Sequence, residues 1–214
     1  MIGNLTGHID VLKDFKSKNI DLKEVLDIGA YEGEWTYHCK QIYPEANVLM
    51  IEANADMEEH LKKIGPYKIE LLSSETDKEV VFHKSLMTHK TGSSIYPENV
   101  AEHKFEEVKL KTKKLSDVVE SKNYDLIKLD TQGSDLDIIN GSKSIFENTK
   151  YLMIETQTLE YNLGAPLFDF TYKYLKDLSF KLEHIYNFES QTFTNINTTF
   201  NMSFDMLWIN ERNL

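Results

Sequence analysis

The chain has 214 residues, of which 41% are hydrophobic and 28% charged, and its formal net charge at pH 7 is −11. This composition is typical of a folded soluble protein, and no apolar run approaches the roughly 18 residues that a membrane span needs. The acidic excess disfavours nucleic acid and membrane surfaces as partners, and the single cysteine, Cys39, excludes a disulfide framework and a cysteine-based zinc site.

Apolar runs of strand length alternate with segments of helical periodicity, which predicts βαβ units and a mainly parallel sheet. The first half of the chain is expected to form helix, strand, helix, strand, helix and a short strand at 10–18, 24–30, 34–43, 47–53, 56–64 and 68–73. Pro44 stops the second of these helices, and Gly65-Pro66 closes the third. This order is one half of a Rossmann-like sheet.

The helical period is lost between 76 and 114, where two β segments flank a polar loop, so we expect a β-rich insertion lying over the sheet. The alternation then resumes with strand, helix, strand and helix at 124–130, 134–146, 151–156 and 167–178. Two last β segments, 181–188 and 203–210, flank a Thr/Asn-rich stretch and predict an antiparallel hairpin.

The expected fold is therefore α/β, with a mostly parallel seven-stranded sheet, a C-terminal antiparallel hairpin and the β-rich insertion at 76–114. We find no repeat and no linker, so one domain over residues 1–214 is expected. The first ten residues lack a basic segment followed by an apolar run, which is why a cytoplasmic protein is expected.

A glycine loop follows the first predicted strand. Asp27, Gly29 and Gly33 form D-x-G-x-x-x-G just before a helix, where open α/β sheets bind cofactors. Glu52 ends the second strand, where Rossmann domains place the acid that accepts both ribose hydroxyls. Adenosine binding is the interpretation, and the expected cofactor-binding set is Asp27, Gly29, Ala30, Gly33, Glu52, Ala53 and Ser73.

The charge of this loop bears on the choice of cofactor. Glu32 and Glu34 would repel a pyrophosphate at the helix N-terminus, and no phosphate-binding G-x-x-x-x-G-K-[ST] motif occurs. S-adenosylmethionine, which has no phosphate and carries a sulfonium cation, fits better than NAD or ATP. The alternative is that the glycines only shape a turn while Glu52 caps the next helix.

A second group of polar residues follows the strand at 124–130, in the segment KLDTQGSDLDIINGS. Asp130 is the carboxylate best placed to face a sulfonium methyl group or to orient a substrate hydroxyl, and Glu155 on the neighbouring strand supplies a second one. Ser134 and Asp137 resemble a helix capping box instead. Lys128 either pairs with a carboxylate or contacts the substrate.

Metal ligation is the less favoured interpretation of these residues. Asp130, Asp135 and Glu155 offer oxygen ligands for magnesium, but nothing in their spacing requires an ion, so no metal site is predicted. Three histidines of the insertion match no zinc motif, namely His83, His89 and His103. Of these, His89 is retained as a candidate base beside Asp130 and Glu155.

The ordered series VLDIGAYEGEWT, LMIEAN, the β-rich middle, KLDTQGSDLDIINGS and IET resembles the FkbM family of methyltransferases over roughly residues 25–156. The resemblance implies a class I methyltransferase fold, S-adenosylmethionine as donor, and O-methylation of a hydroxyl on a sugar, polyketide or related small molecule. Two positions depart from the common pattern. Ala53 stands where a proline is usual, and Gln132 replaces a frequent glutamate, which removes a potential base or metal ligand.

The predicted function is therefore S-adenosylmethionine-dependent methylation of a hydroxyl on a small-molecule or glycan acceptor. Two alternatives remain open at this point. One is a non-catalytic interaction protein that retains the fold, which would release no S-adenosylhomocysteine. The other is an NAD-dependent oxidoreductase, which Glu32 and Glu34 disfavour.

Overall fold

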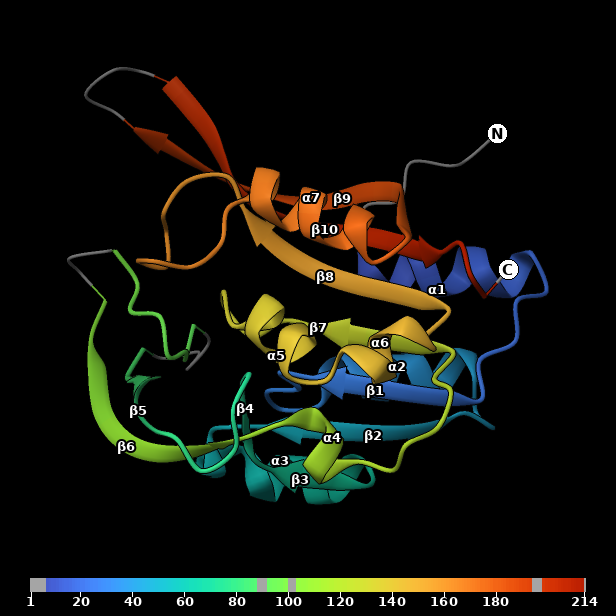
Figure 1. The fold of residues 1–214 in the computed structure, drawn as a ribbon, viewed down its shortest axis with the longest axis horizontal. Helices are drawn as coiled ribbons and strands as arrows, with labels where there is room; N and C mark the ends of the chain where they lie inside the picture. Colours follow the sequence, from blue (N-terminus) through green and yellow to red (C-terminus); the bar gives the residue numbers. More distant parts are fainter. Residues whose placement is uncertain (1–6, 88–91, 100–102, 194–197, 214) are drawn as a thin grey trace.

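The computed structural model describes residues 7–87, 92–99, 103–193 and 198–213, with side chains described outside 190–202. A twisted seven-stranded sheet forms its centre (Figure 1). In spatial order its strands are β3 (Tyr67–Ile69), β2 (Asn47–Glu52), β1 (Glu24–Ile28), β7 (Leu126–Leu129), β8 (Tyr151–Gln157), β10 (Thr198–Asn210) and β9 (Phe180–Phe193). Strands β3, β2, β1, β7 and β8 run parallel, and β10 is antiparallel to both β8 and β9.

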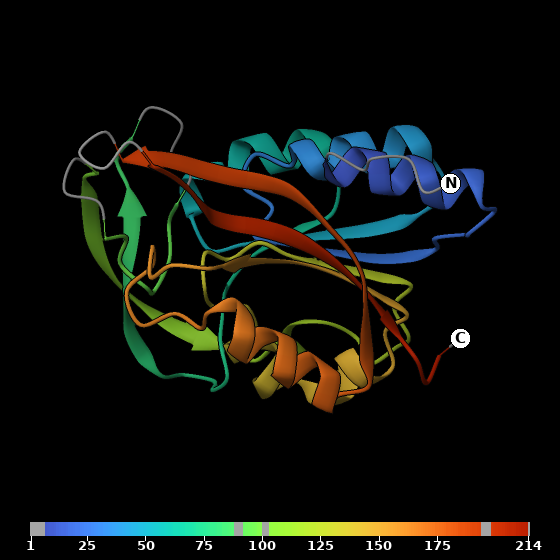
Figure 2. The same ribbon diagram turned by 90° about the horizontal axis from the view of Figure 1, so that it is seen from above.

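Helices cover both faces of this sheet (Figure 2). One face carries α1 (His8–Ser17), α2 (Glu34–Ile42) and α3 (Glu58–Ile64), the last preceded by a 3-10 turn, Ala55–Met57. The other face carries α5 (Asp135–Gly141), α6 (Lys143–Glu147) and α7 (Phe168–Asp177). Because both faces are covered, the central strands are mostly apolar, and every residue of β7 is buried, Lys128 included.

A smaller sheet, ordered β4 (Leu71–Leu72), β6 (Phe105–Lys113) and β5 (Glu79–Ser85), contains the insertion. It stands beyond the end of the main sheet to which the β1, β7 and β8 arrows point (Figure 1). The insertion was expected to lie over the sheet, and no edge or face was specified. Both faces are already occupied by helices, so it lies across the carboxyl ends of the strands.

The predicted α/β fold, its seven strands and its C-terminal hairpin are confirmed, with local differences. The single strand expected at 68–73 is broken at Glu70, so that β3 pairs with β2 while β4 pairs with β6. The helix expected at 134–146 is divided at Ser142, whose φ of −143° is not helical. The break follows Gly141, which lies close to the backbone of Ser73. A Cβ added at Gly141 would lie 2.7 Å from the Ser73 carbonyl oxygen.

The hairpin strands are longer than expected. Residues 191–193 and 198–199 pair as backbone, although a polar loop was predicted there, because their threonines favour extended structure. A one-turn helix, α4 (Leu115–Val118), was not predicted. None of the helices in the described part of the chain is long and apolar enough to cross a membrane.

Candidate active site

A cavity of about 500 Å³ opens at the carboxyl ends of the central strands. Its walls come from the loops after β1, β2 and β7, from β8 to β10, and from the insertion. Of the predicted residues it brings together Gly29, Glu52, Ala53, Asp130 and Glu155. This edge of a parallel sheet is where ligands bind in open α/β folds.

The glycine loop contributes Gly29 and Tyr31 to the cavity wall. Gly29 has a φ of +75°, and a Cβ added there would lie 1.8 Å from the Asp130 backbone oxygen, so the loops after β1 and β7 pass in direct contact. Ala30 and Gly33 do not line the cavity. The Ala30 amide donates to the Ile51 carbonyl, and Gly33, at φ +82°, packs against Met50 where α2 begins.

Asp27 also lies outside the cavity, fully buried beneath this loop. Its carboxylate accepts hydrogen bonds from Thr36 Oγ1 at 2.7 Å and from Lys128 Nζ at 3.2 Å. The Lys128 ammonium also lies 3.3 Å from the Gly29 carbonyl oxygen and 3.5 Å from Asp130 Oδ2. Lys128 therefore pairs with carboxylates, which was one of the two roles left open for it.

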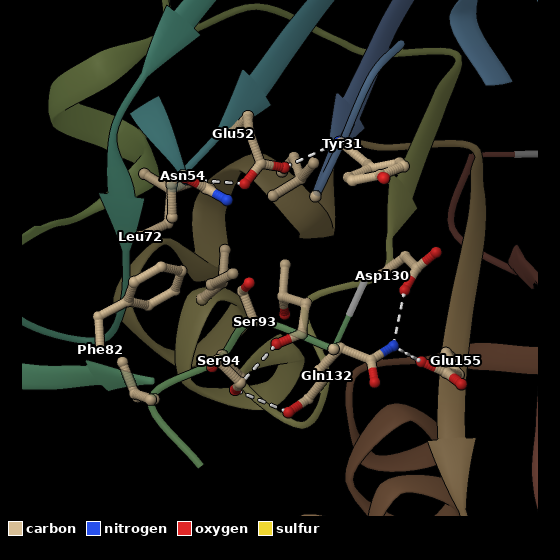
Figure 3. Close-up of a pocket in the computed structure, with 18 of the residues that line it drawn as sticks. Tyr31, Glu52, Asn54, Leu72, Phe82, Ser93, Ser94, Asp130, Gln132 and Glu155 are labelled. Carbon is tan, nitrogen blue, oxygen red and sulfur yellow. Dashed lines mark hydrogen bonds between the residues drawn. The ribbon is translucent and has the colours of Figure 1, made fainter. Parts of the chain in front are cut away.

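Glu52 reaches the cavity from the end of β2 (Figure 3). Its two oxygens accept hydrogen bonds from the backbone amides of Tyr31, at 2.8 Å, and Asn54, at 2.7 Å. Burial raises the pKa of Glu52, and the amides of Asn54 and Tyr31 partly oppose that shift. The carboxylate thus ties the glycine loop to the loop after β2. Ser73 does not line the cavity, although Leu71 and Leu72 just before it do.

Beside Glu52 the wall becomes apolar. Leu72 and Phe82 line the cavity on the same side as Asn54 in Figure 3, and Phe82 belongs to the insertion. Asn54 is 4% exposed, and its Nδ2 has no hydrogen-bond partner among the described residues. A buried donor without a partner carries a desolvation penalty unless something binds it. Sequence reasoning missed Asn54 and Phe82, and we call this part of the cavity the apolar end.

The opposite part, which we call the acidic end, is lined by the carboxylates of Asp130, Glu155, Glu189 and Asp205. Burial raises the pKa of Glu155 well above its usual value, and Asp130 and Asp205 raise it further. Burial acts in the same direction on Asp130, but Lys128 and His8 outweigh it and leave the pKa of Asp130 lowered. Two adjacent carboxylates are thus driven in opposite directions.

His8 at the start of α1 was not predicted to belong to the site. Its Nε2 lies 3.0 Å from Asp205 Oδ2, and Asn187 Nδ2 donates to the same oxygen at 2.6 Å. Both histidine and aspartate line the cavity. A residue near one end of the chain and a strand near the other meet here, and no local motif in the sequence announces that contact.

The predicted candidate base, His89, lies outside the described residues. His103 lines the cavity in contact with Glu98, whereas His83 lies 4.0 Å from Glu107 and does not line it. Within the described part of the chain, no group of three or more His, Cys, Asp or Glu side chains has a metal-binding arrangement.

The capping box expected at Ser134 and Asp137 is not formed. The Ser134 side chain makes no capping hydrogen bond, and Asp137 accepts instead from the Tyr96 hydroxyl of the insertion at 2.8 Å. Asp135 accepts from the Thr131 amide and hydroxyl, and burial raises the pKa of Asp135 to about 6. The tertiary contact with Tyr96 replaces the local one that the spacing predicted.

The family model described as the methyltransferase FkbM domain matches residues 27–182. The chain belongs to this family. The FkbM match runs from the glycine loop through both polar constellations, so the resemblance seen in the motifs is confirmed, and the protein is an S-adenosylmethionine-dependent methyltransferase. No curated protein matches the chain significantly.

Solved structures of methyltransferases share the fold. An S-adenosylmethionine-dependent methyltransferase from Clostridium acetobutylicum is 9% identical with a TM-score of 0.52, over 93% of this chain and 88% of that one. Precorrin-6y C5,15-methyltransferase from Geobacter metallireducens is 14% identical with a TM-score of 0.50, over 98% of this chain and 92% of that one. A candidate RNA methyltransferase from Pyrococcus horikoshii is 11% identical with a TM-score of 0.51, over 94% of this chain and 82% of that one. At these identities the likeness establishes the class I methyltransferase fold.

The residues of the cavity fit S-adenosylmethionine. The unpartnered Asn54 amide and the apolar wall of Leu72 and Phe82 suit an adenine ring, while the Glu52 carboxylate beside them suits ribose hydroxyls. The Gly29 backbone lines the same cavity as the acidic end, whose carboxylates would stabilise the positively charged sulfonium of the donor.

Replacing Glu52 with glutamine is expected to weaken S-adenosylhomocysteine binding about 100-fold, because hydrogen bonds to a charged group are lost. A glutamine NH₂ cannot accept from the Tyr31 or Asn54 amide, and the side chain carries no charge for the ribose hydroxyls. Calorimetric titration measures the effect. Glu45→Gln, at an exposed residue outside the cavity, is the matched control, and an unchanged dissociation constant in Glu52→Gln would remove this role.

Proposed function

We propose that this methyltransferase methylates a hydroxyl oxygen of a small polar acceptor, such as a sugar, at the acidic end of the cavity. The observation that carries the proposal is the composition of that end: Asp130, Glu155, Glu189 and Asp205 line it, and none of the described lining residues is lysine or arginine. Carboxylates accept hydrogen bonds from hydroxyl groups and repel phosphates. The chemistry therefore favours a polyhydroxyl molecule over a nucleic acid.

The adenosyl group would be held by Glu52, Asn54 and the loop at Gly29. S-adenosylmethionine supplies, when bound, a methyl group on a positively charged sulfur that leaves as a neutral thioether. No acid is needed for such a leaving group, so the protein's task is to bring the acceptor oxygen into line and exclude water. Phe82, Ser94 and Glu98 of the insertion form part of the cavity wall.

Asp130 is the residue that would orient the acceptor. Its lowered pKa keeps the carboxylate ionised at neutral pH, so it can accept the acceptor's hydroxyl hydrogen and receive that proton as the new C–O bond forms. Glu155, whose pKa is raised, would stand beside it as a protonated donor to a neighbouring oxygen of the acceptor. These roles match the implication of the FkbM resemblance that a hydroxyl receives the methyl group.

The test is transfer of radiolabelled methyl from S-adenosylmethionine to four acceptor classes: free and aryl-linked sugars, amino sugars, a short RNA and a basic peptide. We expect label on a sugar oxygen, identified by mass spectrometry as a methyl ether, and none on RNA. RNA is included because one structural neighbour is a candidate RNA methyltransferase. Label on RNA, or on nitrogen in the amino sugar or peptide, would contradict the proposal.

A further inference from the structure

The side chain of Gln132 bridges two carboxylates of the acidic end. Its Nε2 donates to Asp130 Oδ1 at 3.2 Å and to Glu155 Oε2 at 2.7 Å (Figure 3). Asp130 and Glu155 follow Leu129 and Ile154, which are paired in adjacent strands, so the two carboxylates project from neighbouring positions at the strand ends. Both hydrogens of one amide group are thereby directed at the two residues that face the acceptor.

The backbone of Gln132 is held in the conformation that this bridge requires. Its φ of +53° is in the left-handed region, which a residue with a side chain rarely adopts. Ser94 of the insertion donates from its hydroxyl to the Gln132 carbonyl at 2.8 Å and lies 3.3 Å from the Thr131 carbonyl. Gly133 then turns away at φ +97°, where an added Cβ would lie 2.4 Å from Ala165.

We propose that Gln132 is a positioning residue for methyl transfer, whose side-chain amide holds the Asp130 and Glu155 carboxylates side by side so that they act on the acceptor as one unit. The proposal rests on the function proposed above. The proposal explains why residue 132 is a glutamine in this chain. A glutamate here would place a third carboxylate between two others, whereas the amide has the same shape and donates to both.

Other charged groups face this pair from every neighbouring element. Lys128 on β7 favours the ionised form of Asp130, and His8 on α1 acts in the same direction. Three further carboxylates favour protonation of Glu155, namely Asp205 on β10, Asp135 on α5 and Glu189 on β9, and the phenols of Tyr161 and Tyr186 also interact with the pair. An amide hydrogen donated to a carboxylate stabilises its charged form, so the Gln132 bridge opposes those three carboxylates.

The test is a carboxyl titration by NMR, with ¹³C at the side-chain carboxyls of aspartate and glutamate in the complex with S-adenosylhomocysteine. Asp130→Asn and Glu155→Gln assign the two signals. In Gln132→Met, which keeps the length but donates nothing, we expect both apparent midpoints to rise by about one pH unit. Gln132→Asn keeps the amide but is one methylene shorter, so we expect only one midpoint to move.

Gln41→Met, on the exposed face of α2, is the matched control and should leave both midpoints unchanged. Thermal unfolding of each variant checks that it is folded. If Gln132→Met does not fold, the midpoints measured in Gln132→Asn test the proposal. Unchanged midpoints in a folded Gln132 variant would overturn the proposal.

Turnover provides a second readout with an acceptor from the panel above. In Gln132→Met we expect kcat at pH 7 to fall more than about 10-fold and S-adenosylhomocysteine affinity to stay the same, because Asp130 is still ionised but is no longer held beside Glu155. The acidic limb of the kcat–pH profile should move up by about one pH unit, as the carboxyl midpoints do. An acidic limb that does not move, or a kcat equal to that of the wild type, would contradict the positioning role. If the wild type methylates no hydroxyl, the proposed function fails, whereas the NMR titration still decides whether Gln132 couples the two carboxylates.

Discussion

Replacing Lys128 with methionine is expected to destabilise the fold by about 3–5 kcal/mol, or roughly 10 °C in the unfolding midpoint for a chain of this length. Burial acts to lower the pKa of the Lys128 ammonium, but Asp27, Asp130 and Asp205 outweigh it, so the group is charged at all working pH values. Methionine preserves the apolar stem and removes the cation. Among the described residues, Asp27, which is 0% exposed, would then retain only the Thr36 hydroxyl as a side-chain partner.

The double substitution Asp27→Asn with Lys128→Met separates this cause from a packing defect. We expect Asp27→Asn to recover part of the stability lost in Lys128→Met, because it neutralises the carboxylate that Lys128→Met leaves unpaired. Lys13→Met, at an exposed position of α1, is the matched control. Thermal and denaturant unfolding measure all four proteins. Single and double variants of equal stability would mean that the buried charge is not the reason.

Much of the fold was predictable because buried parallel strands and amphipathic helices leave local patterns. The runs around Leu26 and Ile127 are apolar at consecutive positions, and such strands lie between two helical layers. Where the fold departs from the prediction, a distant segment is responsible. Glu70 ends one strand because Leu71 and Leu72 pair with β6, more than thirty residues further along the chain.

The candidate site divides in the same way. Glu52 and Asp130 were identified because each ends a strand, and the carboxyl ends of parallel strands converge on one edge. Asp27 belongs to the same motif, but the sequence did not reveal that its side chain turns under the loop toward Lys128, a hundred residues away. The spacing of a motif predicts which residues lie at the carboxyl edge of the sheet. The direction in which each side chain points depends on contacts between strands.

The residues that the sequence did not reveal come from segments without a motif. His8 reaches the cavity through α1, and Phe82 through a strand of the insertion. Asn54, two residues after Glu52, does have a local signal: it is a polar amide directly after an acidic strand end at the cofactor edge. Ser94 could not be found in this way, because its contact with Gln132 exists only once the insertion is folded against the loop after β7.

Replacing Asp130 with asparagine is expected to lower turnover of the acceptor about 100- to 1,000-fold, in the lower part of the range for a lost proton acceptor, with S-adenosylhomocysteine affinity nearly unchanged. Asparagine has the same size and can still receive the Gln132 amide hydrogen through Oδ1, but it cannot take the acceptor's proton. Methyl-transfer kinetics and calorimetry on the same preparation separate the two effects. Asp169→Asn, on an exposed part of α7, is the matched control.

Three outcomes of the Asp130→Asn experiment have different meanings. A selective fall in kcat supports an acceptor-facing carboxylate whose loss is felt in the reaction itself. Turnover at the wild-type level would show that the protein only has to align donor and acceptor, and would remove Asp130 from the mechanism. A fall in S-adenosylhomocysteine affinity as large as the fall in turnover would move Asp130 to the cofactor side of the cavity, and Glu155 would then be the carboxylate left to orient the acceptor.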